Sequence, residues 1–272
     1  MKKETSLLRK EVGSLAGILL PFVIYYVCYL VASIALTFIV IVMLQNLFGL
    51  EQEFFTENEA SINGVISGMA MLVGVVALIP SLRQELLHEK NERIRLNGKI
   101  PMTILLAISS SLAVNILFVL LHLTESSETY KEVAANQYGV AFGLGLVLYG
   151  IVSPFAEEVV FRGLIFNRMK RDYSVKAAVL LSALMFGIYH GNSVQGIYGF
   201  LIGCLIAYIY ERFGNLFYAI LFHGAANIAV FTITGTESLY RVIVTPAGYV
   251  ILTIISVGSI FLIEKMKRKE TE

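Results

Sequence analysis

The chain of 272 residues is 57% hydrophobic and only 15% charged, with a formal net charge of +1 and a mean hydropathy of +0.74. A soluble domain carries about a quarter charged residues, so this composition excludes an ordinary soluble globular protein. Apolar segments of about 20 residues recur along the chain, each long enough to cross a ~30 Å hydrocarbon core. They predict an all-α, polytopic transmembrane helical bundle, for which no nucleic-acid partner is expected.

About eight spans are predicted in chain order. Their approximate bounds are 14–48, 62–82, 100–123, 138–168, 176–190, 196–212, 216–234 and 247–264. The first is too long for one straight crossing and contains Pro21, which predicts a tilted or kinked helix. It also exceeds the apolar core of a signal peptide, which favours an uncleaved anchor. Splitting it into two spans is the less favoured alternative, because the acidic loop 51–59 would then face the cytoplasm.

Lys and Arg are concentrated in alternate loops. The basic segments are the N-terminus, loop 83–99, loop 168–176 and the C-terminal tail. The loops between them, 49–61 and 124–137, contain a single Lys and many Glu. By the positive-inside rule, both termini are predicted to be cytoplasmic. The plasma membrane of a bacterium is the expected location.

Three of the spans carry polar side chains that are costly in hydrocarbon. These side chains are Glu157, Glu158, Arg162, His190, His223 and Asn227. Counted at 1.5 Å per helical residue from Arg168, Lys176 and Asn215 on the cytoplasmic side, Glu157, His190 and His223 lie about 16, 21 and 12 Å deep. Asn227 lies one helical turn deeper than His223. The set is therefore predicted to converge near the middle of the membrane.

Helical spacing suggests a division of roles. Glu158 and Arg162 are four residues apart and can form a neutral pair within one helix. Glu157 is turned by about 100° from Glu158 and is predicted to face a cavity without a counter-ion in its own helix. His223 and Asn227 share one face of the seventh span.

A polar network that only holds helices together would use the same residues. However, a carboxylate, two imidazoles and an amide gathered in a dry site are also what activation of a water molecule requires, so a catalytic or transport role is favoured. A proton-coupled transporter is the weaker alternative, because the sequence shows neither an internal repeat nor matching broken helices.

Three motifs in these spans resemble the CAAX protease and bacteriocin-processing family of intramembrane peptidases. They are Glu-Glu-x3-Arg at 157–162, Phe-x3-His at 186–190 and His-x3-Asn/Asp, which has Asn here, at 223–227. The resemblance extends over 138–234, which is taken as the catalytic core. It is flanked by an N-terminal region of three spans, 1–137, and by 235–272, which contains the last span and a basic tail.

The resemblance implies an endopeptidase that cleaves a peptide or membrane-protein substrate among membrane lipids, at a site reached from the cytoplasm or laterally from lipid. In the implied scheme, Glu157 and His190 activate a water molecule, while His223 and Asn227 stabilise the oxyanion. Glu158, Arg162 and Phe186 support these groups. Catalysis without a cofactor is favoured, because the sequence has no His-Glu-x-x-His motif.

Two alternatives accompany this scheme. The first is a zinc site, in which Glu157, His190 and His223 supply one carboxylate and two imidazole ligands. The second is a non-catalytic bacteriocin-immunity or scaffold protein, which would tolerate the loss of Glu157.

Overall fold

A computed structural model describes the backbone of residues 2–49, 51–88 and 98–271, and the side chains within 15–49, 51–87 and 98–266. Residues 89–97 of the predicted basic loop 83–99 lie outside these ranges, as do the side chains of Lys2, Lys3, Arg9 and Lys10 at the N-terminus and of Lys267, Arg268 and Lys269 in the C-terminal tail. The described chain is helical throughout its regular structure and contains no strand, which confirms the predicted all-α bundle.

Seven helices of the described chain are long and apolar enough to cross a membrane. Six of them are continuous: α1 (Lys2–Phe48), α3 (Glu59–His88), α4 (Lys99–Leu120), α10 (Ser193–Phe213), α11 (Leu216–Thr234) and α13 (Pro246–Thr271). The seventh, Phe142–Asp172, is assembled from five shorter segments.

The predicted span 176–190 is a helix, but it is too short for a straight crossing of the membrane. It corresponds to α9 (Val175–Tyr189), which has 15 residues. At 1.5 Å per residue it is about 22 Å long, less than a ~30 Å core. α9 packs against α10 as an antiparallel hairpin, and the turn at 190–192 joins them.

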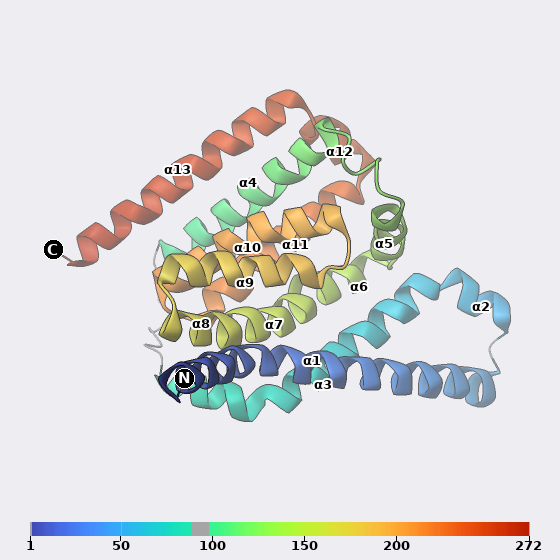
Figure 1. The fold of residues 1–272 in the computed structure, drawn as a ribbon. Helices are drawn as coiled ribbons and strands as arrows, with labels where there is room; N and C mark the ends of the chain where they lie inside the picture. The colour runs from blue at the N-terminus through green and yellow to red at the C-terminus, as the bar shows by residue number, and fades with distance from the viewer. Residues whose placement is uncertain (1, 50, 89–97, 272) are drawn as a thin grey trace.

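Three short helices cover one end of the bundle. They are α2 (Gln52–Glu57), α5 (Glu128–Tyr138) and α12 (Glu237–Ile243). Both chain termini lie at the opposite end, as Figure 1 shows. α2 and α5 lie in loops 49–61 and 124–137, which are predicted to face the same side of the membrane, and the structure places both at one end of the bundle (Figure 1).

The composite fourth span contains two wide π-helical turns. It runs through α6 (Phe142–Val147), η1 (Leu148–Val152), α7 (Ser153–Glu158), η2 (Val159–Phe166) and α8 (Asn167–Asp172), where η1 and η2 are π-helical. Pro154, near the start of α7, has no N–H to donate to the preceding turn, which favours irregular winding there. π-Helical turns occur frequently at functional sites, and these two flank the segment that carries Glu157.

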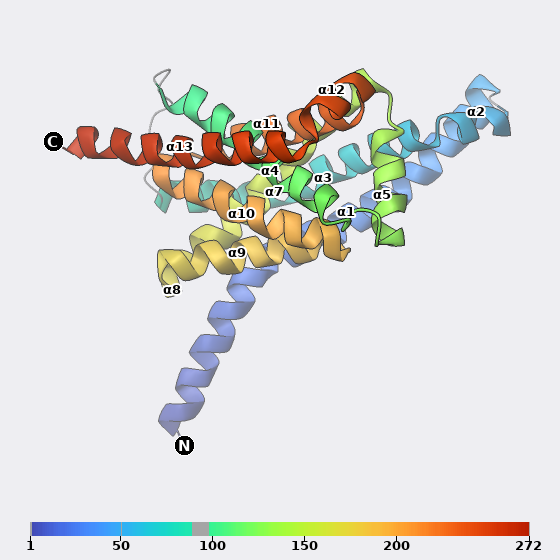
Figure 2. The ribbon, with the colours of Figure 1, turned by 90° about the horizontal axis from the view of Figure 1, so that it is seen from above.

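The predicted kink in α1 is present. Pro21 lies inside the helix, and Figure 2 shows α1 changing direction in its N-terminal half. Proline removes the N–H that would bond the carbonyl four residues earlier, at Gly17. Arg168 of α8 supplies a substitute, because its Nη1 donates to the Gly17 carbonyl at 2.6 Å while its Nε donates to Glu85 at 2.8 Å. This contact ties α1, α3 and α8 together at the end of the bundle that carries the basic loops.

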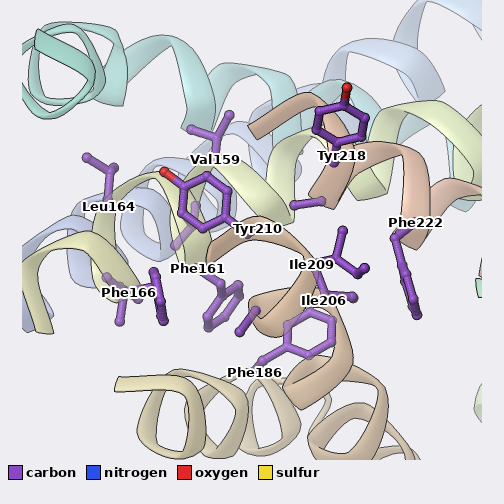
Figure 3. Close-up of a cluster of buried hydrophobic side chains, with 14 of the residues drawn as sticks. Val159, Phe161, Leu164, Phe166, Phe186, Ile206, Ile209, Tyr210, Tyr218 and Phe222 are labelled. Carbon is purple, nitrogen blue, oxygen red and sulfur yellow. The ribbon is translucent and has the colours of Figure 1, made fainter. Parts of the chain in front are cut away.

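η2 is the centre of the packed core, and all eight of its residues are buried. Figure 3 shows its aromatic and aliphatic side chains meeting those of α9, α10 and α11, including Phe186, Ile206 and Phe222. Large apolar side chains of the outer helices are instead exposed, such as Ile34 and Phe38 of α1. Lipid contact accounts for that exposure, since hydrocarbon does not penalise apolar surface.

Candidate functional site

Glu157 is a buried carboxylate with one oxygen left unpaired. Its side chain lies on α7 and the residue is only 4% exposed. Oε1 accepts a hydrogen bond from the Ser153 hydroxyl at 2.9 Å, whereas Oε2 has no hydrogen-bond partner. Oε2 lies 3.8 Å from Nε2 of His223, beyond direct hydrogen-bond distance. A buried unpaired carboxylate oxygen is costly, so it is a strong candidate for a group that acts on a bound molecule.

Glu158 joins two neighbours through one oxygen. Its Oε1 accepts from Arg162 Nη1 at 3.0 Å and from His223 Nδ1 at 2.7 Å. Glu158 and Arg162 are both fully buried, and the expected pair within the helix is present. Arg162 also donates to the carbonyl of Gly203 at 2.8 Å. The carboxylate of Glu158 can only accept a hydrogen bond, so Nδ1 of His223 carries the proton. The other ring nitrogen of His223, Nε2, faces Glu157.

His190 lies where α9 ends. Its Nδ1 is 2.8 Å from the carbonyl of Phe186, which can only accept, so Nδ1 carries the proton and Nε2 is free to accept. The next residue, Gly191, has φ of 74° and turns the chain toward α10. A glycine adopts this left-handed conformation without strain.

Phe186 packs between the two imidazoles. Its ring centroid is 4.8 Å from that of His190 and 5.5 Å from that of His223, edge-on to both. The Arg162 guanidinium lies over the same ring, with its Cζ 4.8 Å from the centroid. One aromatic side chain therefore contacts the ion pair and both histidines, and restricts the orientation of each.

Asn227 lies one turn beyond His223 on α11. Its Nδ2 donates to the carbonyl of Tyr149 at 3.0 Å, in the π-helical segment η1. An amide nitrogen carries two hydrogens, so one remains for another acceptor. The bond also fixes α11 against the fourth span at the level of the site.

Close glycine contacts set the separation between these helices. A Cβ added to Gly224 would lie 2.4 Å from the Gly150 carbonyl oxygen, and one added to Gly187 would lie 2.4 Å from that of Gly196. Small residues let membrane helices approach closely. Here they bring α11 onto η1 and α9 onto α10, which places the candidate residues in one cluster.

The cluster lines a cavity of about 210 Å³. Its walls include Glu157, His190, His223 and Asn227, together with Phe186. The structure thus brings the four predicted catalytic residues to one cavity. Glu158 and Arg162 lie behind it, buried and paired.

The donor types are those that zinc prefers, and each histidine has its Nδ1 held by an outer partner, as in many zinc sites. However, in the part of the chain that the structure describes, no three His, Cys, Asp or Glu side chains converge closely enough to hold a metal ion. The described geometry therefore does not fit a zinc site formed by Glu157, His190 and His223, and no step below passes through a metal.

Sequence reasoning missed several groups. Ser153 was detectable, because it lies four residues before Glu157 on the same helix face. The bond between Glu158 and His223 joins residues 65 positions apart, and no local pattern indicates it. The same holds for Tyr149, whose carbonyl accepts from Asn227 because a π-helical turn presents it there.

Fold and site together define a polytopic helical membrane protein with a buried site of glutamate, histidine and asparagine. A model of the family described as type II CAAX prenyl endopeptidase Rce1-like matches residues 139–229. That range contains all seven residues predicted from the three motifs. A curated protein of Bacillus subtilis (strain 168), "Putative membrane peptidase YdiL", is 26% identical over 174 residues, which are 61% of this chain and 68% of that protein. No solved structure gives a significant match. The two similarities confirm the family resemblance carried by the motifs.

Proposed function

We propose that this protein is an intramembrane endopeptidase of the bacterial plasma membrane, which hydrolyses a peptide bond of a membrane-associated or lipidated polypeptide. Similarity to proteins described as peptidases supports the class of reaction. The observation that carries the proposal is the unpaired Oε2 of buried Glu157, at the wall of a cavity that two histidines share.

In the first step, Glu157 and His190 activate water. Oε2 of Glu157 and the free Nε2 of His190 accept hydrogen bonds from a water molecule in the cavity. The water oxygen bonds to the scissile carbonyl carbon, its proton passes to the Glu157 carboxylate, and the carbonyl π electrons move to the carbonyl oxygen. General base catalysis of this kind contributes about 10²–10⁴-fold in rate.

In the same step, His223 and Asn227 stabilise the oxyanion that forms. Asn227 donates its remaining amide hydrogen, and His223 donates from a protonated Nε2. The carboxylates of Glu157 and Glu158 and the guanidinium of Arg162 sum to one negative charge, which a protonated His223 neutralises. A neutral cluster is favourable at membrane depth, where uncompensated charge is costly. Each oxyanion donor in such a site contributes about 3–4 kcal/mol.

In the second step, the tetrahedral intermediate collapses. The carbonyl re-forms, the carbon–nitrogen bond breaks, and the leaving amine takes the proton held by Glu157. The products are a new carboxyl terminus and a new amino terminus, and Glu157 returns to its ionised form. Glu158, Arg162 and Phe186 act as positioning residues for the two histidines.

Hydrolysis by the purified protein tests the proposal. The protein is reconstituted in lipid, incubated with a panel of membrane-segment and lipidated peptides in water enriched in oxygen-18, and the products are read by mass spectrometry. We expect cleavage at an internal bond, with oxygen-18 in the new carboxyl terminus. Intact peptides across the panel, together with retained biological function of Glu157→Gln in cells, would favour a scaffold instead.

A further inference from the structure

The cavity extends from the catalytic cluster toward α5. Beyond the cluster it is lined by the outer ends of α4 and α11, by the start of α10 and by α5. Thr124, Tyr130 and Gln137, which lie in or beside α5, are partly exposed and line the cavity as well. α5 lies between α4 and α6 in the chain. It follows the end of α4 that is remote from Lys99, and it precedes the end of the fourth span that is remote from Arg168. The cavity therefore leads toward the end of the bundle opposite the termini (Figure 1).

The other direction is filled by side chains. Toward the end that carries the basic loops, buried apolar side chains of η2, α10 and α11 pack against one another, and Figure 3 shows several of them. Phe161, Ile206 and Phe222 are among the fully buried residues there. Protein interiors packed in this way leave no channel wide enough for a polypeptide.

The lining combines apolar side chains with neutral polar ones and is almost uncharged. It contains four phenols and three amides besides Asn227: Tyr130, Tyr138, Tyr149, Tyr198, Asn115, Gln137 and Gln195. Glu157 is the only carboxylate among the described lining residues, and none is Lys or Arg. Burial raises the pKa of Tyr130 to about 12, which keeps this phenol neutral at physiological pH.

This chemistry suits one class of occupant. Phenols and side-chain amides both donate and accept hydrogen bonds, which is what the N–H and C=O groups of an extended backbone require. A charged side chain would lose its hydration in the cavity without gaining an opposite charge, apart from the cluster itself. Beyond the catalytic cluster, the described lining also offers no cation for a terminal carboxylate or a phosphate.

We propose that the site is entered beneath α5, and that its substrate is an uncharged, extended stretch of polypeptide presented at that face of the membrane. This rests on the proposed endopeptidase function. If both termini are cytoplasmic, as the distribution of Lys and Arg predicts, the entrance is on the extracytoplasmic side. It then differs from the cytoplasmic or lateral entrance that the family resemblance implies.

Thiol accessibility tests the entrance without requiring catalysis. The native cysteines are replaced in a Cys28→Ala, Cys204→Ala background, and single cysteines are introduced as Ser153→Cys in the cavity, Glu128→Cys on α5 and Lys176→Cys at the start of α9. The last two residues are exposed and mark the two faces. Intact cells are treated with a membrane-impermeant maleimide, before and after permeabilisation. Thermal unfolding shows that each variant remains folded.

We expect Ser153→Cys and Glu128→Cys to react in intact cells, and Lys176→Cys to react at least about tenfold faster after permeabilisation. If Ser153→Cys, like Lys176→Cys, reacted only after permeabilisation, the proposal would be overturned. Reaction with a lipid-soluble maleimide alone would overturn it too, since that indicates entry from the bilayer. If the labelling is as expected but the protein cleaves no peptide, the result would support the inferred entrance and contradict the proposed endopeptidase function.

The substrate class has its own test. A cleaved peptide is compared with matched copies that carry Lys or Asp a few residues from the scissile bond, in the stretch that would occupy the cavity beyond the catalytic cluster. We expect kcat/KM to fall at least about tenfold for both charged copies, because each charge is desolvated in a neutral cavity. Equal cleavage of neutral and charged copies would contradict the inferred class.

Discussion

Glu158 and His223 are joined by a 2.7 Å hydrogen bond between Oε1 and Nδ1, although they belong to different spans. The same oxygen holds Arg162 at 3.0 Å. The pair within the helix therefore does more than neutralise a charge: it also fixes the ring of a candidate catalytic histidine. Stability and catalysis are consequently expected to separate between the two adjacent glutamates.

Glu158→Gln is expected to destabilise the protein strongly. The substitution leaves Arg162 as an uncompensated charge in a fully buried position, and breaking a buried pair costs about 3–5 kcal/mol. Thermal unfolding in detergent measures the effect, with Glu157→Gln as the matched control that leaves the pair intact. Similar unfolding temperatures for the two variants would contradict the assigned pairing.

Asn227→Ala is expected to lower kcat by about 10²–10³ with little change in KM, as loss of one oxyanion donor typically does. Asn227→Asp is expected to retain partial activity, because the family resemblance includes either residue at this position. Asn115→Ala serves as the control, since Asn115 lines the cavity but is assigned no role at the reacting atoms. An equal loss of kcat in both alanine variants would contradict the assignment of Asn227 as a hydrogen-bond donor to the oxyanion.

Gly224→Ala is expected to impair both stability and activity. The added methyl group would lie 2.4 Å from the Gly150 carbonyl oxygen, so α11 must move away from the fourth span and carry His223 and Asn227 with it. Overpacking of this kind costs about 1–3 kcal/mol. Gly258→Ala, in α13, has no atom within 4 Å of the added methyl and should be neutral. Unfolding temperature and cleavage rate measured on both variants check the contact.

The metal content of the purified protein distinguishes a mechanism in which residues alone activate water from one in which a bound metal ion assists. We expect no stoichiometric metal in the purified protein and no inhibition by chelators. Elemental analysis of the wild type and of His190→Ala and His223→Ala is sufficient. About one zinc per chain in the wild type, lost in both variants, would overturn the metal-free mechanism and leave the peptidase assignment intact.

Much of the fold could be predicted because the length of an apolar run is a local property of the sequence. Hydropathy found the spans, and Pro21 predicted the kink in α1. The exception was 176–190, which was predicted as a span although its 15-residue helix is too short for a straight crossing. Hydropathy does not reveal that difference, because a short membrane helix and a full-length span are equally apolar.

The site was predictable to a smaller extent. Depth and helical spacing identified Glu157 and the histidines, because ionisable residues are rare in apolar spans. The bond from Glu158 to His223 and the shape of the cavity depend on how distant helices pack. The contact of Gly224 with Gly150 and the π-helical turns around α7 set that packing, and neither has a clear sequence signature.

The most direct test of the account is the cleavage rate of Glu157→Gln compared with the wild type, on any peptide that the wild type cleaves. Glutamine keeps the size of the side chain and an oxygen that can accept from Ser153, but it cannot take a proton from water at neutral pH. The account predicts loss of cleavage to background, with an unfolding temperature close to that of the wild type. A stable Glu157→Gln protein that cleaves at the wild-type rate would contradict the central claim that Glu157 is the base.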